Sequence, residues 1–359
     1  MSSLKPILLF YRPRYPSWRA QDIQVLHAAY ELAVLGHPVT LFANRDNAKI
    51  EAADVFKDFD LPYCDRLNLQ LSPVRHLGLT GIWFRKNLIQ WWYQNQGVVI
   101  VRDLRRLAQW LPWLTAKQKI VIEAHQLPSI QAKDRGDDAI AEVAIEQIVL
   151  REAWGLITNC GGVMKLWEET YPELLPKYRK IIHNGTAPSR QLISSEHQPV
   201  IRCLGSLRPE KGIRQLLPTL IQSQSPIELI GASRDEQQEL GPLPAHIHIG
   251  PAVAYPAVPP LLATARALLL PLQNNRFGRH LTSPLKLWDY LATDRPILAP
   301  DLASLREIAT HSKRKIHLFD PDHPVQLLKY LNGNLPHTEK PYLRSWQDRA
   351  VELSGFLAQ

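Results

Sequence analysis

Short apolar stretches alternate with longer segments of helical periodicity along the whole chain. In the first half they cover residues 7–11, 39–42, 98–101, 120–122, 156–158 and 181–183. A second series covers residues 200–204, 227–230, 247–249, 267–270, 297–299 and 316–319. Buried parallel strands read as continuous apolar runs and their crossovers as helices, so this alternation predicts parallel sheets with helices on both faces. We therefore expect an α/β protein with two halves of similar construction.

A polar stretch with two prolines separates the two series. Residues 186–199 show no apolar period, as expected of an interdomain linker. The length of 359 residues also exceeds what one hydrophobic core usually supports. We expect an amino-terminal domain over residues 1–185, a carboxyl-terminal domain over residues 200–340 and a final segment over residues 341–359.

The clearest local signal for a ligand is the helix predicted to begin after Thr282. Ser283 is a favoured N-cap and Pro284 a favoured first helical residue. The first-turn N–H groups lack intrahelical partners and carry the positive end of the helix dipole, so they suit an anion. Lys286 adds a cation that a bound anion would offset, and Asp289 on the same face could reach sugar hydroxyls. This pattern favours a nucleotide site, whereas the alternative is an ordinary buried helix.

A second candidate anion site follows the first strand of the second series. Gly205 permits a tight turn, and Arg208 and Lys211 place two cations near the start of the next helix. Two cations so placed suit a diphosphate. The alternative is a surface turn with two solvated charges.

Two features of the first half lie beyond the carboxyl ends of strands, where open α/β sheets bind ligands. The loop after the first strand carries Arg12, Arg14 and Arg19 together with Trp18, which suits an anionic or sugar-bearing acceptor. A solvated basic loop is the alternative. His125 ends a later strand and is placed to face a substrate, although a lone histidine is more often structural.

Composition bears on partners and location. The net charge of +8 favours an anionic partner, and no nucleic-acid-binding motif is visible, so we expect no nucleic acid. Residues 74–96 combine aromatic and basic side chains, which suits either an anionic membrane surface or a core helix with a solvated back. The three cysteines have no metal-ligand spacing, and the amino-terminal apolar run is short for an export signal. We expect a cytoplasmic protein, and the membrane-surface interpretation of residues 74–96 would add peripheral attachment to the inner face of the membrane.

Several stretches taken together resemble one enzyme family, the retaining glycosyltransferases of family 4. They are residues 30–40, 123–125, 183–185, 205–212 and 283–302. The family has the GT-B fold of two facing Rossmann-like domains, which the resemblance implies for nearly the whole chain. The stretch around Ser345, Trp346, Arg349 and Ala350 is similar to the family's carboxyl-terminal helix, which packs back across the domain junction.

The resemblance implies transfer of a sugar, with retention, from a UDP- or GDP-linked donor to a glycan or lipid-linked acceptor. The setting it implies is bacterial surface polysaccharide or glycolipid assembly, without a metal or other cofactor. By the resemblance, Lys211 and Arg208 hold the diphosphate and His125 sits over the donor sugar, which makes these three the expected catalytic residues. Asp289 would bind the ribose. The remaining donor-binding residues would be Gly205, Ser206, Thr282, Ser283, Pro284, Leu285 and Lys286.

The chain departs from the family at two positions of the donor site. Ser206 stands where the family often has arginine, and Leu281 stands where it usually has the first of two glutamates eight residues apart. Contacts to the sugar ring would then fall to Arg279, His280 or Thr282. These departures motivate a second hypothesis, a non-catalytic accessory or scaffolding relative. A sugar-nucleotide epimerase on the same fold is a third.

Overall fold

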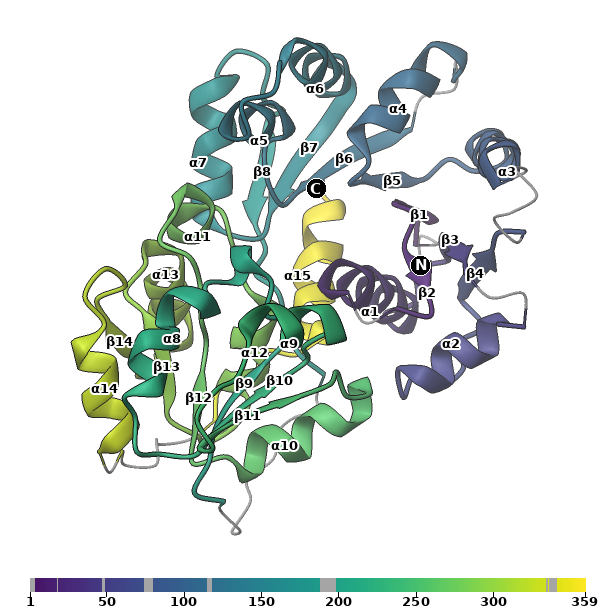
Figure 1. Ribbon diagram of the computed structural model, residues 1–359. Coiled ribbons are helices and arrows are strands. Elements are labelled where there is room, and N and C mark those ends of the chain that lie inside the picture. The colour runs from purple at the N-terminus through teal and green to yellow at the C-terminus, as the bar shows by residue number, and fades with distance from the viewer. Residues whose placement is uncertain are drawn as a thin grey trace. The chain divides into compact units, whose positions relative to one another are not determined.

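The computed structural model describes residues 4–17, 19–46, 49–73, 80–114, 118–187, 198–333, 335 and 341–359. The chain divides into two compact units, which we call unit 1 (Met1–His183 with Trp346–Gln359) and unit 2 (Asn184–Ser345). Each unit contains one parallel sheet with helices packed around it (Figure 1). The predicted α/β class with two parallel sheets is therefore confirmed.

The described residues of unit 1 form an eight-stranded sheet in the order β2-β3-β1-β5-β6-β7-β8, with β4 also paired to β3. The strands are β1 (Ile7–Phe10), β2 (Arg14–Tyr15), β3 (Val39–Arg45), β4 (Leu67–Leu71), β5 (Val98–Val101), β6 (Lys119–Ala124), β7 (Ala153–Thr158) and β8 (Tyr178–Ile181). In the central register Ile7 lies between Val39 and Val98. Every residue of β1 and β5 is buried, which explains why both strands are uninterrupted apolar runs.

Helices cover the sheet of unit 1. They are α1 (Ala20–Val34), α2 (Ala52–Asp58), α3 (Thr80–Gln94), α4 (Leu104–Trp110), the 3-10 turn η2 (Leu111–Trp113), α5 (Pro128–Asp134), α6 (Ile140–Glu152), α7 (Gly161–Thr170) and α15 (Trp346–Leu357). Gly36 ends α1 with a left-handed φ of 101°, as its position in the sequence predicts. Residues 74–79, which begin the predicted aromatic and basic segment, lie outside the described residues.

The carboxyl-terminal helix α15 belongs to unit 1 and packs beside α1 (Figure 1). The Trp346 ring stacks on the His27 ring of α1, with 5.5 Å between the ring centroids. Burial of this large aromatic pair is a strong apolar contribution to the contact of the two helices. The last helix is thereby part of the core of unit 1, although it follows unit 2 in the sequence.

Unit 2 has a six-stranded sheet over its described residues, in the order β11-β10-β9-β12-β13-β14, and every neighbouring pair is parallel. The strands are β9 (Ile201–Leu204), β10 (Ile227–Ile230), β11 (Ile247–Gly250), β12 (Ala267–Leu269), β13 (Ile297–Pro300) and β14 (His317–Phe319). Reversal of strand order at β9 and β12 produces the kind of switch point beside which open parallel sheets bind ligands.

The sheet of unit 2 has a hydrophobic core on each face. Helices α8 (Ile213–Ile221) and α14 (Val325–Asn332) contribute to one core. Helices α10 (Val258–Thr264), α12 (Leu285–Leu291) and α13 (Ala303–Ser312) contribute to the other. The remaining elements are η4 (Pro209–Lys211), α9 (Arg234–Leu240), η5 (Tyr255–Ala257) and α11 (Arg276–His280).

Unit 2 begins at Asn184, before the predicted linker. Asn184 donates a hydrogen bond from Nδ2 to the Ser283 carbonyl oxygen at 2.9 Å, and Arg344 donates from Nε to the Asn184 carbonyl oxygen at 3.1 Å. These bonds anchor Asn184 to unit 2, whereas the domain boundary expected from the sequence, at residue 185, placed it in the amino-terminal domain. Of the predicted linker, residues 188–197 lie outside the described residues.

Candidate functional site

A cationic group lies at the carboxyl end of β9 in unit 2. Gly205, the first residue after this strand, has a left-handed φ of 115°. This φ favours glycine, and a Cβ at this position would lie 2.8 Å from Nζ of Lys286, so the ammonium group lies close to the backbone here. The chain then turns through η4, and Gly212 with φ of 84° leads into α8. The turn predicted from Gly205 is therefore present, and it is built around a lysine from another helix.

Lys286 and Lys211 influence each other electrostatically. Burial lowers the pKa of Lys286, the Cys203 thiol opposes this, and the positive charge of Lys211 lowers the pKa further. Two ammonium groups that destabilise one another's charge favour a bound anion, because the anion offsets both. We therefore define the cationic cradle as Gly205, Lys211 and Lys286. Sequence reasoning assigned all three to the donor site, and the structure places them together.

The start of α12 differs from the sequence prediction. The helix begins at Leu285, and Pro284 is its N-cap with an extended ψ of 125°. Ser283 is not the cap, because its Oγ accepts a hydrogen bond from Nε1 of Trp288 at 3.1 Å. A buried indole N–H requires an acceptor, and this requirement outweighs the capping preference of serine. The prediction of a Ser283 N-cap followed by a helical Pro284 was therefore wrong.

Asp289 is held by a residue that the sequence did not implicate. Its Oδ1 accepts a hydrogen bond from Oγ1 of Thr186 at 2.5 Å. Thr186 in turn forms an isolated parallel bridge with Ser345. The half-buried Asp289 carboxylate is therefore oriented, and one of its oxygens is engaged. Ribose binding by Asp289 stays a prediction.

The other residues expected around the donor have varied surroundings. Arg208 is exposed, and its Nε lies 3.4 Å from Oγ of Ser206, a long contact. Leu281 is only 7% exposed, and Thr282 is likewise buried. Arg279 is exposed and donates to Asn274. Of the sugar-ring candidates, Arg279 and His280 are therefore the exposed ones.

Unit 1 holds a separate polar cluster at the carboxyl end of β6. Oε1 of Glu123 accepts hydrogen bonds from Nε2 of His125 at 3.0 Å, Nε2 of Gln24 at 2.6 Å and Nη2 of Arg349 at 2.7 Å. Arg102 donates to the other end of the Gln24 amide. Burial alone would raise the pKa of Glu123, but Arg349, the bond from His125 and Arg102 together hold that pKa well below its usual range. Glu123 is therefore a buried carboxylate that stays ionised.

His125 is fixed through both ring nitrogens. Nε2 bonds the Glu123 carboxylate, and Nδ1 lies 3.1 Å from Nδ2 of Asn159. Since a carboxylate only accepts, Nε2 carries a proton. Burial and then the positive charge of Arg102 lower the pKa of His125 to about 4, although the Glu123 carboxylate acts in the opposite direction. His125 is therefore neutral at pH 7 and is unsuited to act as a proton donor there.

The pKa of His125 predicts a pH dependence of stability. An unfolded histidine takes up a proton near pH 6.5, whereas the pKa of His125 in the folded protein is about 4. The unfolded state binds more protons in this window, so stability falls by about 3 kcal/mol as the pH drops from 6.5 to 4. Denaturant unfolding of wild type and His125→Gln between pH 4 and 7 checks this. An equal pH slope in both proteins would contradict the assignment.

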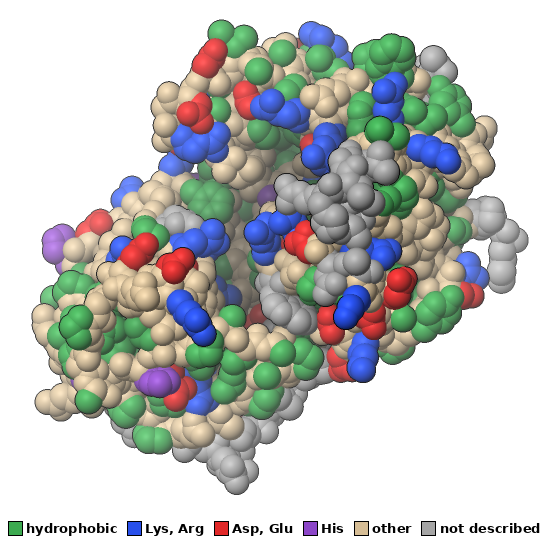
Figure 2. All heavy atoms as spheres, turned by 45° about the vertical axis from the view of Figure 1, so that its right-hand side comes forward, with side chains coloured by type: hydrophobic (Ala, Val, Ile, Leu, Met, Phe, Trp, Pro, Cys, Tyr) green, Lys and Arg blue, Asp and Glu red, His purple; other side chains and the backbone are tan. Residues whose placement is uncertain are grey.

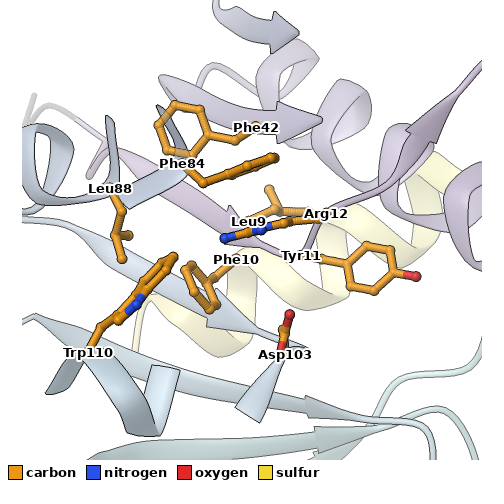
Figure 3. A pocket seen from close by; sticks show the side chains of 9 residues that line it. All are labelled: Leu9, Phe10, Tyr11, Arg12, Phe42, Phe84, Leu88, Asp103 and Trp110. Atoms are coloured by element: carbon orange, nitrogen blue, oxygen red, sulfur yellow. The ribbon is translucent and has the colours of Figure 1, made fainter. Parts of the chain in front are cut away.

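The predicted acceptor residues have different surroundings. Arg12 extends from the end of β1 into a group of aromatic rings (Figure 3). Arg14 lies in β2 and pairs with Asp46 at 3.4 Å, while Arg19 is exposed at the N-cap position of α1. Trp18 lies outside the described residues. The acceptor role of all four stays a prediction.

Helix α3 carries most of the segment that suggested a membrane surface. Its buried residues are Phe84, Leu88, Trp91 and Trp92, which pack in the core. Ile82 is 68% exposed, and Arg85 and Lys86 are exposed near it. On the coloured part of the face in Figure 2, basic side chains are interspersed with apolar and acidic ones. Membrane attachment stays a prediction, which sedimentation with anionic vesicles at low and high salt would test.

Two features are absent from the described part of the chain. No helix there is long and apolar enough to cross a membrane. No group of three or more His, Cys, Asp or Glu side chains is placed there to hold a metal ion. The expectation that no metal or other cofactor is needed stays a prediction.

Comparison with known proteins gives a likeness at the level of structure. No known family description matches the sequence, and no curated protein matches it. Sucrose-phosphate synthase from Thermosynechococcus elongatus is similar over 98% of this chain and 94% of its own, with 12% identity and a TM-score of 0.66. Anabaena Alr3699/HepE in complex with UDP and glucose is similar over 98% and 95%, with 14% identity and a TM-score of 0.64.

Two more structures show how widely the fold is shared. WaaG, a glycosyltransferase involved in lipopolysaccharide biosynthesis, is similar over 97% of this chain and 95% of its own, with 13% identity and a TM-score of 0.62. UDP-GlcNAc 2-epimerase from Methanocaldococcus jannaschii is similar over 98% and 99%, with 12% identity and a TM-score of 0.54. At these identities the likeness establishes the fold, which is that of GT-B enzymes.

Proposed function

We propose that the protein is a glycosyltransferase that uses a nucleoside diphosphate sugar as donor. The observation that carries this proposal is the cationic cradle of Gly205, Lys211 and Lys286 at the carboxyl end of β9. Two mutually repelling ammonium groups beside the start of α12 suit a diphosphate. Anabaena Alr3699/HepE, which has the same fold, is seen in one structure with UDP and glucose and in another with UDP-glucose, which supports a donor of this class.

In the proposed reaction, unit 2 stabilises the leaving group. The bond between the anomeric carbon and the diphosphate oxygen breaks, and its electron pair stays on that oxygen. Lys211 and Lys286 would offset the growing negative charge. The acceptor hydroxyl oxygen forms the new bond to the anomeric carbon on the face from which the diphosphate departs, and it passes its proton to the departing diphosphate. Bond formation on that same face gives retention. We assign the ribose contact to Asp289.

Unit 1 would contribute positioning rather than proton transfer. His125 is neutral at pH 7 and both of its ring nitrogens are engaged, so an acid role does not fit it. We propose that Glu123, Gln24 and Asn159 keep this ring in one orientation. The acceptor would be a glycan or a lipid-linked glycan, and the setting a bacterial surface polysaccharide or glycolipid pathway, which the likeness to WaaG supports. Family 4 membership and a cytoplasmic location belong to the same proposal.

A donor panel tests the proposed reaction. Incubation with UDP- and GDP-sugars, with and without glycan acceptors, is expected to release UDP or GDP and to form a glycoside only when an acceptor is present. An isomerised donor in the absence of acceptor would instead identify an epimerase, a reaction found on the same fold. Absence of any turnover or nucleotide binding in folded protein would favour the scaffolding alternative, which Ser206 and Leu281 motivated.

A further inference from the structure

Arg12 is held between aromatic rings at the carboxyl end of β1. Its guanidinium carbon lies 3.9 Å from the ring centroid of Phe84 and 5.6 Å from that of Trp110. Figure 3 shows the side chain reaching into the pocket with Phe84 on one side and Phe10 and Trp110 on the other. A guanidinium stacked in this way loses little further freedom when it binds a ligand.

The hydrogen-bonding capacity of Arg12 is unused within the described part of the chain. No described side chain or carbonyl accepts a hydrogen bond from it, and none forms an ion pair with it. Asp103 lines the same pocket, but its carboxylate caps α4 by accepting from the Arg106 backbone N–H and also pairs with the Arg106 side chain at 2.8 Å. The cavity itself is about 10 Å³, room for about one water, so an oxyanion would reach the half-buried guanidinium from its solvent-exposed side.

The surroundings of Arg12 make its positive charge costly. Burial and, to a smaller extent, the nearby charge of Arg106 lower the pKa of Arg12 to about 10, while Asp103 acts in the opposite direction. Arg102 lies at the end of the neighbouring strand β5, with its guanidinium carbon 4.9 Å from the Tyr11 ring centroid. A partly desolvated cation that forms no ion pair with a described residue is stabilised by an anion that reaches it. The surroundings of the Arg12 guanidinium therefore favour a bound anion.

We propose that Arg12 is the binding site for an oxyanion group, a phosphate or a carboxylate, carried by the acceptor. The planar guanidinium presents paired N–H donors that match the oxygens of either group. Identification of the ligand as the acceptor rests on the proposed function, whereas the anion site itself rests on Arg12 and its pocket. The proposal narrows the acceptor to acidic or phosphorylated compounds and disfavours neutral sugars.

Direct titration tests the anion site without reference to catalysis. The Arg12 side-chain N–H resonance is followed by NMR while methyl phosphate, glucuronate or neutral methyl glucoside is added to the full chain. We expect a saturable shift with one or both anions and none with the glucoside. The anion that binds with the higher affinity shows whether the site prefers a phosphate or a carboxylate. Absence of a saturable shift with either anion would overturn the proposal, as would an equal shift with the glucoside.

Variants assign the binding to this residue. Anion affinity, measured at backbone amides around β1, should fall at least tenfold in Arg12→Gln and by less in Arg12→Lys, which keeps the charge but not the planar fork. Arg135→Gln is the matched control, because it removes one exposed arginine that pairs with Asp137 on the same unit. If Arg12→Gln destabilises the fold, Arg12→Lys decides. Unchanged affinity in Arg12→Lys, or an equal loss in Arg135→Gln, would overturn the proposal.

An acceptor comparison then separates the anion site from the proposed function. If transfer occurs, Arg12→Gln should raise KM for a phosphorylated acceptor at least tenfold and leave KM for the donor unchanged. An unchanged acceptor KM would overturn the acceptor assignment while the glycosyltransferase proposal stood. If no transfer occurs with any donor but the anions still shift Arg12, the proposed function fails and the anion site is upheld.

Discussion

Replacement of Glu123 by alanine is expected to lower the free energy of unfolding by about 3–5 kcal/mol. Glu123 is buried, and it accepts hydrogen bonds from Gln24, His125 and Arg349. Arg349 is only 2% exposed. Loss of the Glu123 carboxylate would therefore leave the positive charge of Arg349 uncompensated inside unit 1. Loss of one partner of a buried pair costs far more than loss of an exposed pair. Urea unfolding at pH 7 measures the change.

Two further variants separate charge from packing at Glu123. Glu123→Gln keeps the size and one acceptor oxygen, so its loss of stability should be intermediate. Glu169→Ala is the control, since Glu169 forms an exposed pair with Lys165 and should change stability by less than about 0.5 kcal/mol. A Glu123→Ala protein as stable as the Glu169→Ala control would show that the buried pair does not hold α15 to β6.

Replacement of Lys211 by alanine is expected to reduce the initial rate of donor turnover by about 10²–10³. In the proposed reaction the diphosphate leaves with its negative charge increased, and Lys211 and Lys286 are the cations that influence one another in the cradle. Removal of one cation weakens the stabilisation of the leaving group more than it weakens substrate binding. Initial rates with the active donor of the panel measure the effect.

The matched control for this rate is Lys329→Ala. Lys329 is an exposed lysine of α14 in the same unit. Its replacement removes the same charge at a position that is distant in sequence from the residues of the cationic cradle. Its rate should stay within about twofold of wild type, because an exposed charge contributes little. A comparable loss in both variants would indicate a general charge effect and would contradict the assigned role of Lys211.

The sheets and the cradle residues could be predicted from the sequence because their signals are local. Runs such as residues 7–10 and 98–101 are apolar at every position, which is how a strand buried on both faces must read. Gly205, Lys211 and Lys286 each carry a recognisable chemical signal. Their meeting depends on parallel strands bringing successive loops to one edge of the sheet, which the strand pattern also predicts.

The contacts that orient the candidate residues could not be predicted, because they join distant parts of the chain. Glu123 and Arg349 are 226 residues apart, and Thr186 and Asp289 are 103 residues apart. No periodicity or spacing relates such pairs. The error at Ser283 has a similar cause, since its hydroxyl is engaged by the indole of Trp288 and the capping preference was overridden by tertiary packing.

Calorimetric titration of the full chain with UDP and GDP tests the central claim most directly. Wild-type protein should bind one of the two nucleotides, and Lys211→Ala should bind it at least tenfold more weakly, while Lys329→Ala should bind it as wild type does. A charge-assisted contact to a phosphate accounts for a loss of this size. Absence of binding of either nucleotide to folded wild-type protein, or equal binding by Lys211→Ala, would contradict a diphosphate site at Gly205, Lys211 and Lys286.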